Sequence, residues 1–383
     1  MGPTTFLKKR KKKFEFFIFI MSSYICDELV DEIFKRLPSK SLLRFRSLSK
    51  SWCSHISSPD FILKQTTFQS ARNFQNILIQ HRTLRSENFY RVHYQSPLNS
   101  QYGNYGTRSM KFPNGCYMVG SCNGIICLRD NSNDVSLWNP SIRRKLDLPF
   151  LGYFSNNSRV VGFGFDSNTD DYMTVRLFYP GYGELYKSMV YSLKKRVWCE
   201  ITPPSTHILR VRSAACFVNG ALHWVVLTCS FYEIILTFDL STQLFSEIML
   251  PEEPIRQTIC PIIFNGSLGM SISDNYYTHI WAMKEYKNNT SWYMVLKLEN
   301  FQFEGGVDAV LQLKNGNILI RNYKNVYEVR YPGGECSEVC ERDSPTVEIF
   351  GMVMYVESLA LLDIGTACID ANQPYFTMNR GEL

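Results

Sequence analysis

The chain has 383 residues, enough for two or three domains, and its composition is that of a soluble globular protein. The formal charge of +6 at pH 7 comes from the basic run at residues 8–13, because the chain without its first 20 residues has 35 basic and 34 acidic side chains. A nearly neutral folded part argues against a nucleic-acid-binding surface. No apolar run approaches the roughly 18 residues of a membrane span, so we expect neither a nucleic-acid nor a membrane partner.

The sequence offers no cofactor or metal site. Its 12 cysteines are too sparse for a disulfide scaffold, contain no C-x-x-C pair, and are expected to be reduced and mostly buried. The six histidines are scattered, without a pair at the spacing of metal ligands on a helix. We therefore expect no cofactor and no bound metal.

Residues 1–21 are expected to form a disordered basic extension. The basic run is followed by FEFFIFI, from Phe14 to Ile20, which has the order of a signal peptide but is short, contains Glu15 and lacks a small-residue cleavage pattern. On charge alone the run could direct nuclear import. Alternatively, Met21 is the natural start and the first 20 residues are an upstream extension.

The next stretch, from Ile25 to Leu63, predicts three short helices. The first begins with acidic residues, ends with basic ones and stops at Pro38, since the residue before a proline is pushed out of the helical region. Ser39 is predicted to cap the second helix, and Ser58-Pro59-Asp60 to open a last turn. The apolar positions of the three helices are Leu29, Val30, Ile33, Phe34 and Leu37, then Leu42, Leu43 and Phe45, then Leu48, Trp52 and Ile56.

A unit of about 40 residues is near the lower limit for folding on its own core. These helices carry more large apolar side chains than they can bury among themselves, so the surplus should meet a partner.

The run LPSKSLLRFRSLSKSWCSHISSPDF resembles the plant form of an F-box. Ile25-Cys26 departs from the Leu-Pro that usually opens the first F-box helix. The resemblance implies docking onto the Skp-type adaptor of a cullin ubiquitin ligase. Some of the docking candidates, Trp52 and Ile33 among them, could instead fill the small core. The candidates are Ile25, Leu29, Ile33, Leu37, Pro38, Leu42, Leu43, Leu48 and Trp52.

After Phe68 the pattern changes to short alternating strands with a repeat. Asn-Gly turns recur at positions 123, 219, 265 and 315, each followed by an aromatic-apolar strand, a polar turn and another strand. Between the first two turns, VVGFGFDSNTDDYMTVRLFY uses a different turn. The strand markers are Trp138, Tyr191, Phe238, Trp281 and Tyr327.

Five such units have the period of β-propeller blades. A sixth can be assembled from NILIQHR, NFYRVHY and the C-terminal VEIFGMVMYVESLALL, so that the last strand closes the ring and removes its exposed edges. The predicted fold is α+β and multidomain: a small all-α three-helix F-box followed by a kelch-like propeller of six blades. Five or seven blades, or a two-sheet sandwich, would also accommodate the strands.

This region carries a second resemblance. GSCNGIICL, LWNPSIRRKLDLP and GFGFDSNTDDYMTVRL are similar to signatures of the plant F-box-associated interaction domain, and MYVESLALL to the ends of S-locus-type F-box proteins. We expect the F-box at residues 22–68, the F-box-associated propeller at 69–366 and a disordered tail at 367–383.

Three patterns that suggest other chemistry have simpler explanations. Gly162-x-Gly164 lacks the third glycine of a nucleotide loop and is expected to serve turn or strand packing. The acidic run from Asp166 starts like a calcium loop but has Asp171 and Leu177 where Gly and Glu are needed, so it predicts a polar turn. His223 lies in a predicted strand, where packing is favoured over catalysis.

Aromatic residues mark a candidate target-binding face. If each blade runs from the inside outward, the Asn-Gly turns lie on one face and the remaining loops on the other. Tyrosine gives a large contact area with a polar tip, which interfaces favour, although these rings could fold back onto the blades. The residues collected on the second face are Tyr153, Phe154, Tyr179, Tyr182, Phe231, Tyr232, Tyr276 and Tyr277.

Together the resemblances imply a non-catalytic substrate receptor of a Skp–cullin–F-box (SCF) ubiquitin ligase in the cytoplasm, the nucleus or both. The expected partners are a Skp-type adaptor, cullin through it, and an unidentified target protein marked for proteasomal degradation. One alternative is an S-locus-type determinant that recognises a ribonuclease, another an F-box adaptor acting outside a ligase. An enzyme with a site in the propeller channel is disfavoured by the missing ligand clusters.

Overall fold

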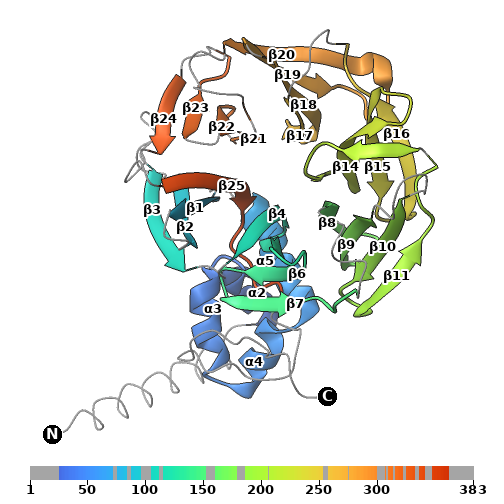
Figure 1. The fold of residues 1–383 in the computed structure, drawn as a ribbon. Helices are drawn as coiled ribbons and strands as arrows, with labels where there is room; N and C mark the ends of the chain where they lie inside the picture. The colour runs from blue at the N-terminus through green and yellow to red at the C-terminus, as the bar shows by residue number, and fades with distance from the viewer. Residues whose placement is uncertain are drawn as a thin grey trace, which may run out of the picture.

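The computed structural model shows a ring of sheets with a small helical unit beside it (Figure 1). It describes residues 26–361, apart from 72–75, 84–87, 96–104, 112–114, 152–159, 179–185, 206, 253–257, 275, 300–306, 308, 314, 322–324, 333–335 and 341–346. No helix in this part of the chain is long and apolar enough to cross a membrane.

The helical unit consists of α2 (Asp27–Phe34), α3 (Ser39–Arg46), α4 (Lys50–Ile56) and α5 (Pro59–Ala71). The prediction of three helices and a last turn is wrong in one respect, because Ser58-Pro59 opens a helix of 13 residues. Ser58 caps it as expected, since its hydroxyl accepts the Phe61 amide at 3.3 Å. Ser39 does not cap α3: it is the first helical residue, is fully buried and makes no capping bond, and Pro38 occupies the N-cap position.

The described strands form six sheets, the number of blades expected from the sequence. Five of them have four strands. The fourth blade has five strands, because β12 and β13 both pair with the same edge of β14. A short 3₁₀ turn, η2 (Asn289–Ser291), precedes β20. The first blade consists of β25 (Val347–Tyr355), β1 (Asn76–Thr83), β2 (Asn88–Gln95) and β3 (Tyr105–Lys111), and the second of β4 (Cys116–Cys122), β5 (Ile125–Asp130), β6 (Val135–Asn139) and β7 (Arg144–Asp147). The third consists of β8 (Val160–Asp166), β9 (Asp171–Phe178), β10 (Lys187–Ser192) and β11 (Val197–Ile201), and the fourth of β12 (Ile208–Val211), β13 (Cys216–Val218), β14 (Ala221–Thr228), β15 (Glu233–Asp239) and β16 (Leu244–Met249). The fifth consists of β17 (Thr258–Phe264), β18 (Ser267–Ser273), β19 (Tyr277–Met283) and β20 (Trp292–Glu299), and the sixth of β21 (Ala309–Gln312), β22 (Ile318–Arg321), β23 (Val326–Val329) and β24 (Cys336–Cys340).

The last strand closes the ring, as the sequence predicted. β25 pairs antiparallel with β1, in a register that sets Asn76 opposite Tyr355 and Thr83 opposite Val347. It is the innermost strand of the first blade and contacts the inner strands β4 and β21 on either side. The ring is therefore held shut by hydrogen bonds between strands from opposite ends of the chain.

Repeated turns and strands match the sequence pattern. The Asn-Gly pairs at 123, 219 and 265 have both residues at positive φ, the geometry of a two-residue type I′ hairpin turn. They join β4 to β5, β13 to β14 and β17 to β18. All five aromatic markers, from Trp138 to Tyr327, lie in the third strand of their blades.

Apolar side chains fill the spaces between neighbouring blades. One cluster joins the third and fourth blades and is centred on the fully buried Trp224, and similar clusters join the following blades. Two tryptophans on outer strands donate their indole N–H groups to backbone carbonyls: Trp198 to Pro149 O, just beyond β7, and Trp292 to Met249 O of β16, each at 2.9 Å. Each bond connects one blade to the blade before it.

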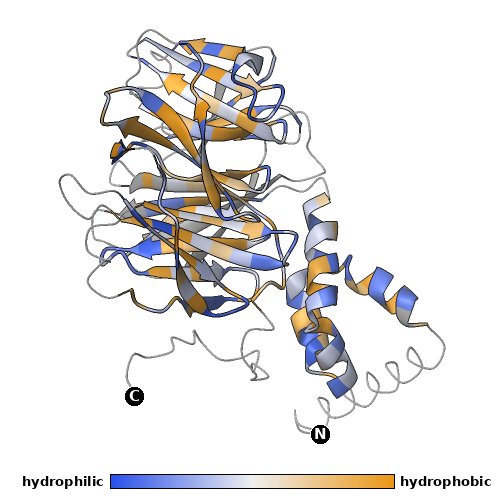
Figure 2. Ribbon diagram, turned by 90° about the vertical axis from the view of Figure 1, so that its right-hand side faces the viewer, coloured by the Kyte–Doolittle hydropathy of each residue, from blue (hydrophilic) through white to orange (hydrophobic). Residues whose placement is uncertain are grey.

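The two faces of the ring differ in their connections. We call "turn face" the side that carries the turns from first to second and from third to fourth strand, and "loop face" the opposite side. β1 begins and β25 ends on the turn face, because Asn76 pairs with Tyr355. The helical unit, which runs directly into β1, accordingly stands at one face of the ring (Figure 2).

Gly162 and Gly164 lie in β8, so the prediction of strand packing is confirmed. A Cβ on Gly164 would overlap the Phe217 ring and lie 2.8 Å from the Leu240 side chain. A Cβ on Gly162 would lie 2.6 Å from the Trp224 ring. Both glycines therefore allow the third blade to approach the fourth closely.

We expect Gly164→Ala to destabilise the propeller by about 1–3 kcal/mol, the usual cost of forcing extra atoms into a packed core. Gly120→Ala is the matched control, since Gly120 is also in an inner strand and a Cβ there would meet nothing within 4 Å. Denaturant unfolding of both variants measures the difference. Equal stabilities would contradict the close packing described here.

Candidate functional site

The helical unit is built around one aromatic side chain. Phe34 of α2 is buried and packs edge-on against Trp52 and Phe61 and face-on against Phe45, with ring centroids 5.1, 6.3 and 5.6 Å away. The amide of Trp52 donates to the hydroxyl of Ser49, which caps α4, at 3.1 Å. Aromatic packing thus holds all four helices together.

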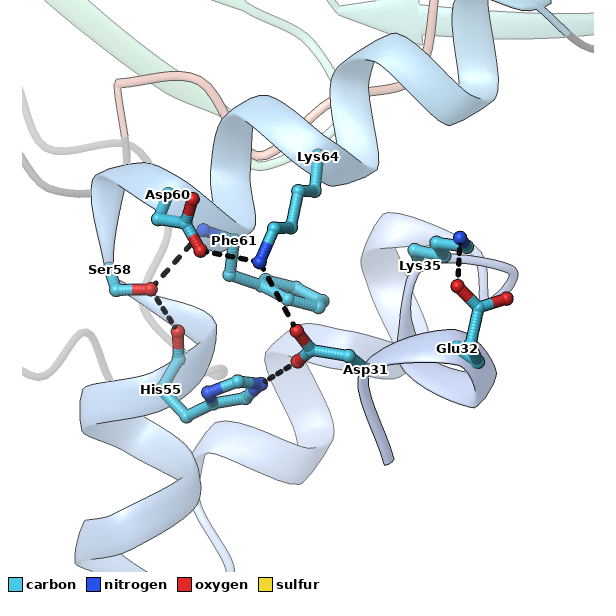
Figure 3. A network of polar contacts seen from close by, with 8 residues as sticks. All are labelled: Asp31, Glu32, Lys35, His55, Ser58, Asp60, Phe61 and Lys64. Carbon is cyan, nitrogen blue, oxygen red and sulfur yellow. Dashed lines mark hydrogen bonds and ion pairs between the residues drawn. The ribbon is translucent and has the colours of Figure 1, made fainter. Parts of the chain in front are cut away.

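A polar network fastens the same helices at their edge (Figure 3). Asp31 of α2 pairs with His55 Nε2 of α4 at 2.6 Å and with Lys64 Nζ of α5 at 3.5 Å. Lys64 also reaches Asp60 at 2.7 Å. The side chain of Asp31 therefore links three helices, while Glu32 one residue later pairs with Lys35 on its own helix.

On the outer side of α2, two apolar side chains have no cover. Leu29 is 55% and Ile33 42% exposed, and they lie four residues apart on one face of the helix. Pro38, between α2 and α3, is also exposed. We call the exposed pair Leu29 and Ile33, both predicted docking residues, the "outer patch".

The remaining docking candidates divide into three groups. Leu42 is fully buried in the core of the unit, where it presents no surface to a partner. Leu37, Leu43 and Trp52 are half-buried against that core, and Leu48 is half-buried. Ile25 lies outside the described residues.

The loop face carries the described aromatic candidates. Phe231 and Tyr232 lie between β14 and β15, and Tyr276 and Tyr277 lie at the start of β19, both connections being on this face. Phe231 is 79% and Tyr276 73% exposed, which shows that these two rings do not fold back onto the blades. Tyr153, Phe154, Tyr179 and Tyr182 lie outside the described residues.

Phe231 is held in an unfavourable backbone conformation. Its φ of 62° is in the left-handed region, where a bulky side chain is rare. The turn is nevertheless well fixed, because the Phe231 amide donates to Thr228 O at 3.0 Å and the Thr228 amide to Tyr232 O at 2.9 Å. A glycine or asparagine would satisfy this turn at lower cost, so packing and turn geometry do not explain the phenylalanine.

The second aromatic pair is also preorganised. The Asp274 carboxylate accepts the amides of Tyr276 and Tyr277, both at 2.6 Å, and these backbone hydrogen bonds lower the pKa of Asp274. Lys297 Nζ lies 3.7 Å from the centre of the Tyr277 ring. The loop face thus presents two aromatic turns, in adjacent blades, that need little ordering to bind a partner.

The acidic run from Asp166 is a hairpin turn between β8 and β9, as predicted. Asp166 accepts the Asn168 amide at 3.0 Å and the Thr169 hydroxyl at 2.6 Å. Its carboxylate oxygens are therefore used within the turn. Among the described residues, no three His, Cys, Asp or Glu side chains are grouped as a metal site would require.

The nine cysteines whose side chains the structure describes are all free thiols. The expectation that they are mostly buried is wrong for this part of the chain, because Cys26, Cys199 and Cys229 are exposed and three more are half-buried. Burial raises the pKa of Cys216 to about 12, so that thiol is protonated near neutral pH.

Comparison with known proteins assigns both parts of the chain. The F-box domain family matches residues 23–64, and the F-box associated beta propeller domain family matches residues 76–315. The chain is 26% identical over 318 residues to the F-box/kelch-repeat protein At3g23880 of Arabidopsis thaliana, which covers 76% of this chain and 86% of the relative. It is 28% identical over 307 residues to the F-box protein CPR1 of the same plant, covering 71% and 72%.

His223 is a packing residue, as predicted from its place in a strand. It is fully buried in β14, with Nδ1 3.2 Å from Cys216 O and Nε2 3.0 Å from the Tyr286 hydroxyl. A carbonyl can only accept, so Nδ1 carries the proton and Nε2 accepts from Tyr286. Burial lowers the pKa of His223 to about 4.

This geometry makes the propeller acid-sensitive. The unfolded histidine has a pKa of about 6.5 and takes up a proton before the folded one, so stability falls as the pH drops from 7 toward 4. We expect a loss of about 2 kcal/mol from this residue between pH 7 and pH 5. His223→Gln should lack that loss, whereas His207→Gln, at an exposed histidine, should keep it; denaturant unfolding at the two pH values measures both. An unchanged acid loss in His223→Gln would refute the assignment.

Proposed function

Because the chain belongs to the family of F-box proteins that carry an F-box associated β-propeller domain, we propose that it is the substrate-recognition subunit of an SCF-type ubiquitin ligase. The F-box binds a Skp-type adaptor, and through it cullin. The propeller binds a target protein, which is ubiquitinated and degraded by the proteasome. In this role the chain acts in the cytoplasm, the nucleus or both.

The outer patch is the proposed adaptor contact. Leu29 and Ile33 remain exposed although the same helix buries Val30 and Phe34, so α2 has one covered and one uncovered apolar face. Burying an exposed leucine or isoleucine on a partner contributes about 1.5–3 kcal/mol. The uncovered face of α2 is the observation that carries the proposal.

The aromatic turns of the loop face are the proposed target contact. They lie on the opposite side of the ring from the strand ends that lead to the F-box. A target bound there would not compete with the adaptor for space. The propeller then acts by holding a lysine of the target near the charged conjugating enzyme, which raises its effective concentration. In this scheme the chain supplies no nucleophile, acid or base.

The adaptor contact can be separated from the F-box core by mutation. Leu29→Gln with Ile33→Gln should leave the fold intact, since both side chains are exposed and glutamine is a good helix former. The affinity for a purified Skp-type adaptor should fall about ten- to a hundredfold, the usual effect of losing interface anchors. Titration calorimetry measures the affinity, and circular dichroism the helix content.

Leu244→Gln serves as the control, because Leu244 is 60% exposed on the outer strand β16 of the propeller and does not belong to the F-box. Trp52→Ala should also weaken adaptor binding, but by unfolding the F-box, since it removes a ring that packs on Phe34 and Phe45. Unchanged adaptor affinity in the double glutamine variant would overturn the proposed contact.

The target contact is tested at Phe231. Phe231→Gly should leave the free energy of unfolding unchanged or raise it by up to about 1 kcal/mol, because glycine adopts positive φ without strain. Proteins enriched by the wild-type propeller in proximity labelling should lose their enrichment in this variant, while adaptor recovery stays constant. Leu244→Gln is again the control. A loss of stability with unchanged enrichment would show that Phe231 is structural.

A further inference from the structure

Beyond the closing strand β25, the chain continues along the turn face through residues 356–361, the "C-terminal strap". Ser358, Leu359, Ala360 and Leu361 are all buried, although none belongs to a strand or helix. The ring is already closed at Tyr355, so propeller closure does not require this segment. Its burial calls for a separate role.

One buried side chain holds the strap in place. Asn139, at the end of β6, donates from its amide nitrogen to Ser358 O at 3.1 Å and to Ala360 O at 2.8 Å. The Ser358 amide in turn donates to the Ser141 hydroxyl at 3.2 Å. These bonds satisfy backbone carbonyl and amide groups of the strap that burial removes from water. The strap is therefore held in one position by hydrogen bonds as well as buried.

A glycine makes room for the strap. Gly124, in the turn between β4 and β5, lies very close to the strap. A Cβ there would overlap Ser358 Oγ and Val356 O and lie 2.8 Å from Ser358 Cβ. Gly220 occupies the same place in the Asn-Gly turn of the fourth blade, with φ of 72° against 77°, and a Cβ there would meet nothing within 4 Å. The positive φ of the turn favours glycine at both positions, but an added Cβ would meet other atoms only at Gly124.

The strap also belongs to the apolar cluster that contains the core of the F-box. Leu359, Ala360 and Leu361 lie in one continuous apolar cluster that includes Phe34 and Phe61 of the helices and Leu137 of β6. Its trace passes beside α5 in the close view of the helices (Figure 3). The segment thus shares an apolar cluster with the F-box helices and is hydrogen-bonded to the propeller at the same time.

We propose that the C-terminal strap fixes the F-box to the blade of β4–β7 and so sets the orientation of the helices relative to the propeller. Asn139 and Gly124 are positioning residues for it. The strap fixes this orientation whether or not an adaptor or a target is bound. The purpose of the fixed orientation is a constant geometry between adaptor and target, and this part of the proposal rests on the proposed function.

The test compares Gly124→Ala with Gly220→Ala by hydrogen exchange of the full chain. Both variants carry the same backbone strain, but only Gly124→Ala displaces the strap. We expect amides of α5 and of residues 356–361 to exchange at least about tenfold faster in Gly124→Ala, while the inner strands of the third to sixth blades stay protected. Wild-type protection of α5 in Gly220→Ala supports the proposal. Equal behaviour of α5 in the two variants overturns it.

A second pair avoids the strained turn. Asn139→Asp keeps the oxygen that accepts the Ser141 amide at 2.9 Å, but replaces the donor to the strap by a carboxylate facing carbonyl oxygens. Asp239, at the same position of the fourth blade, accepts the Ser241 amide at 3.0 Å, so Asp239→Asn is the control. Faster exchange of α5 and a broader small-angle scattering profile in Asn139→Asp alone support the strap. If Asn139→Asp retains both wild-type profiles, the proposal fails, whether or not Gly124→Ala folds.

Discussion

The structure depends on the antiparallel pairing of the first strand of the propeller with the last. This pairing supplies the hydrogen bonds that an open ring would leave exposed at two strand edges. Its register also sets where the chain can go next. Because Asn76 lies opposite Tyr355, the segment that precedes β1 and the segment that follows β25 leave the ring side by side, on the turn face. The F-box and the C-terminal strap meet there for that reason.

This arrangement divides the apolar surface of the F-box between two uses. The inner side, with Phe34 and Phe61, belongs to a cluster that runs without a break into the strap and the second blade. The outer side keeps Leu29 and Ile33 exposed. The aromatic turns at Phe231 and Tyr276 lie across the ring. One chain thus presents two separate surfaces, each on a rigid element and each on its own side.

Much of this could be predicted from the sequence, because the signals are local. Asn-Gly turns require positive φ, and one aromatic residue per blade marks the third strand, so the repeat and its closure could be found. The residues of the candidate site were harder to predict from the sequence. Helical periodicity identified the apolar face of each helix but not which neighbour would cover it, so Leu42 was grouped with Leu29 although only the latter is exposed.

Other features depend on contacts between distant parts of the chain. The strained φ of Phe231, the length of α5 and the strap held by Asn139 have no signal in the spacing of residues. Asn139 and Ser358 are 219 positions apart, and each resembles an ordinary turn residue on its own. Only the folded ring brings them together.

The position of β25 also bears on biosynthesis. Its residues are the last of the propeller to leave the ribosome, yet they form the innermost layer of the first blade. Until translation has passed residue 355, the emerging polypeptide has five blades and an incomplete one, with apolar strand edges unpaired. Incomplete rings of this kind are prone to aggregation, and a premature stop codon ahead of Val347 would yield a product that carries the F-box but cannot complete its propeller.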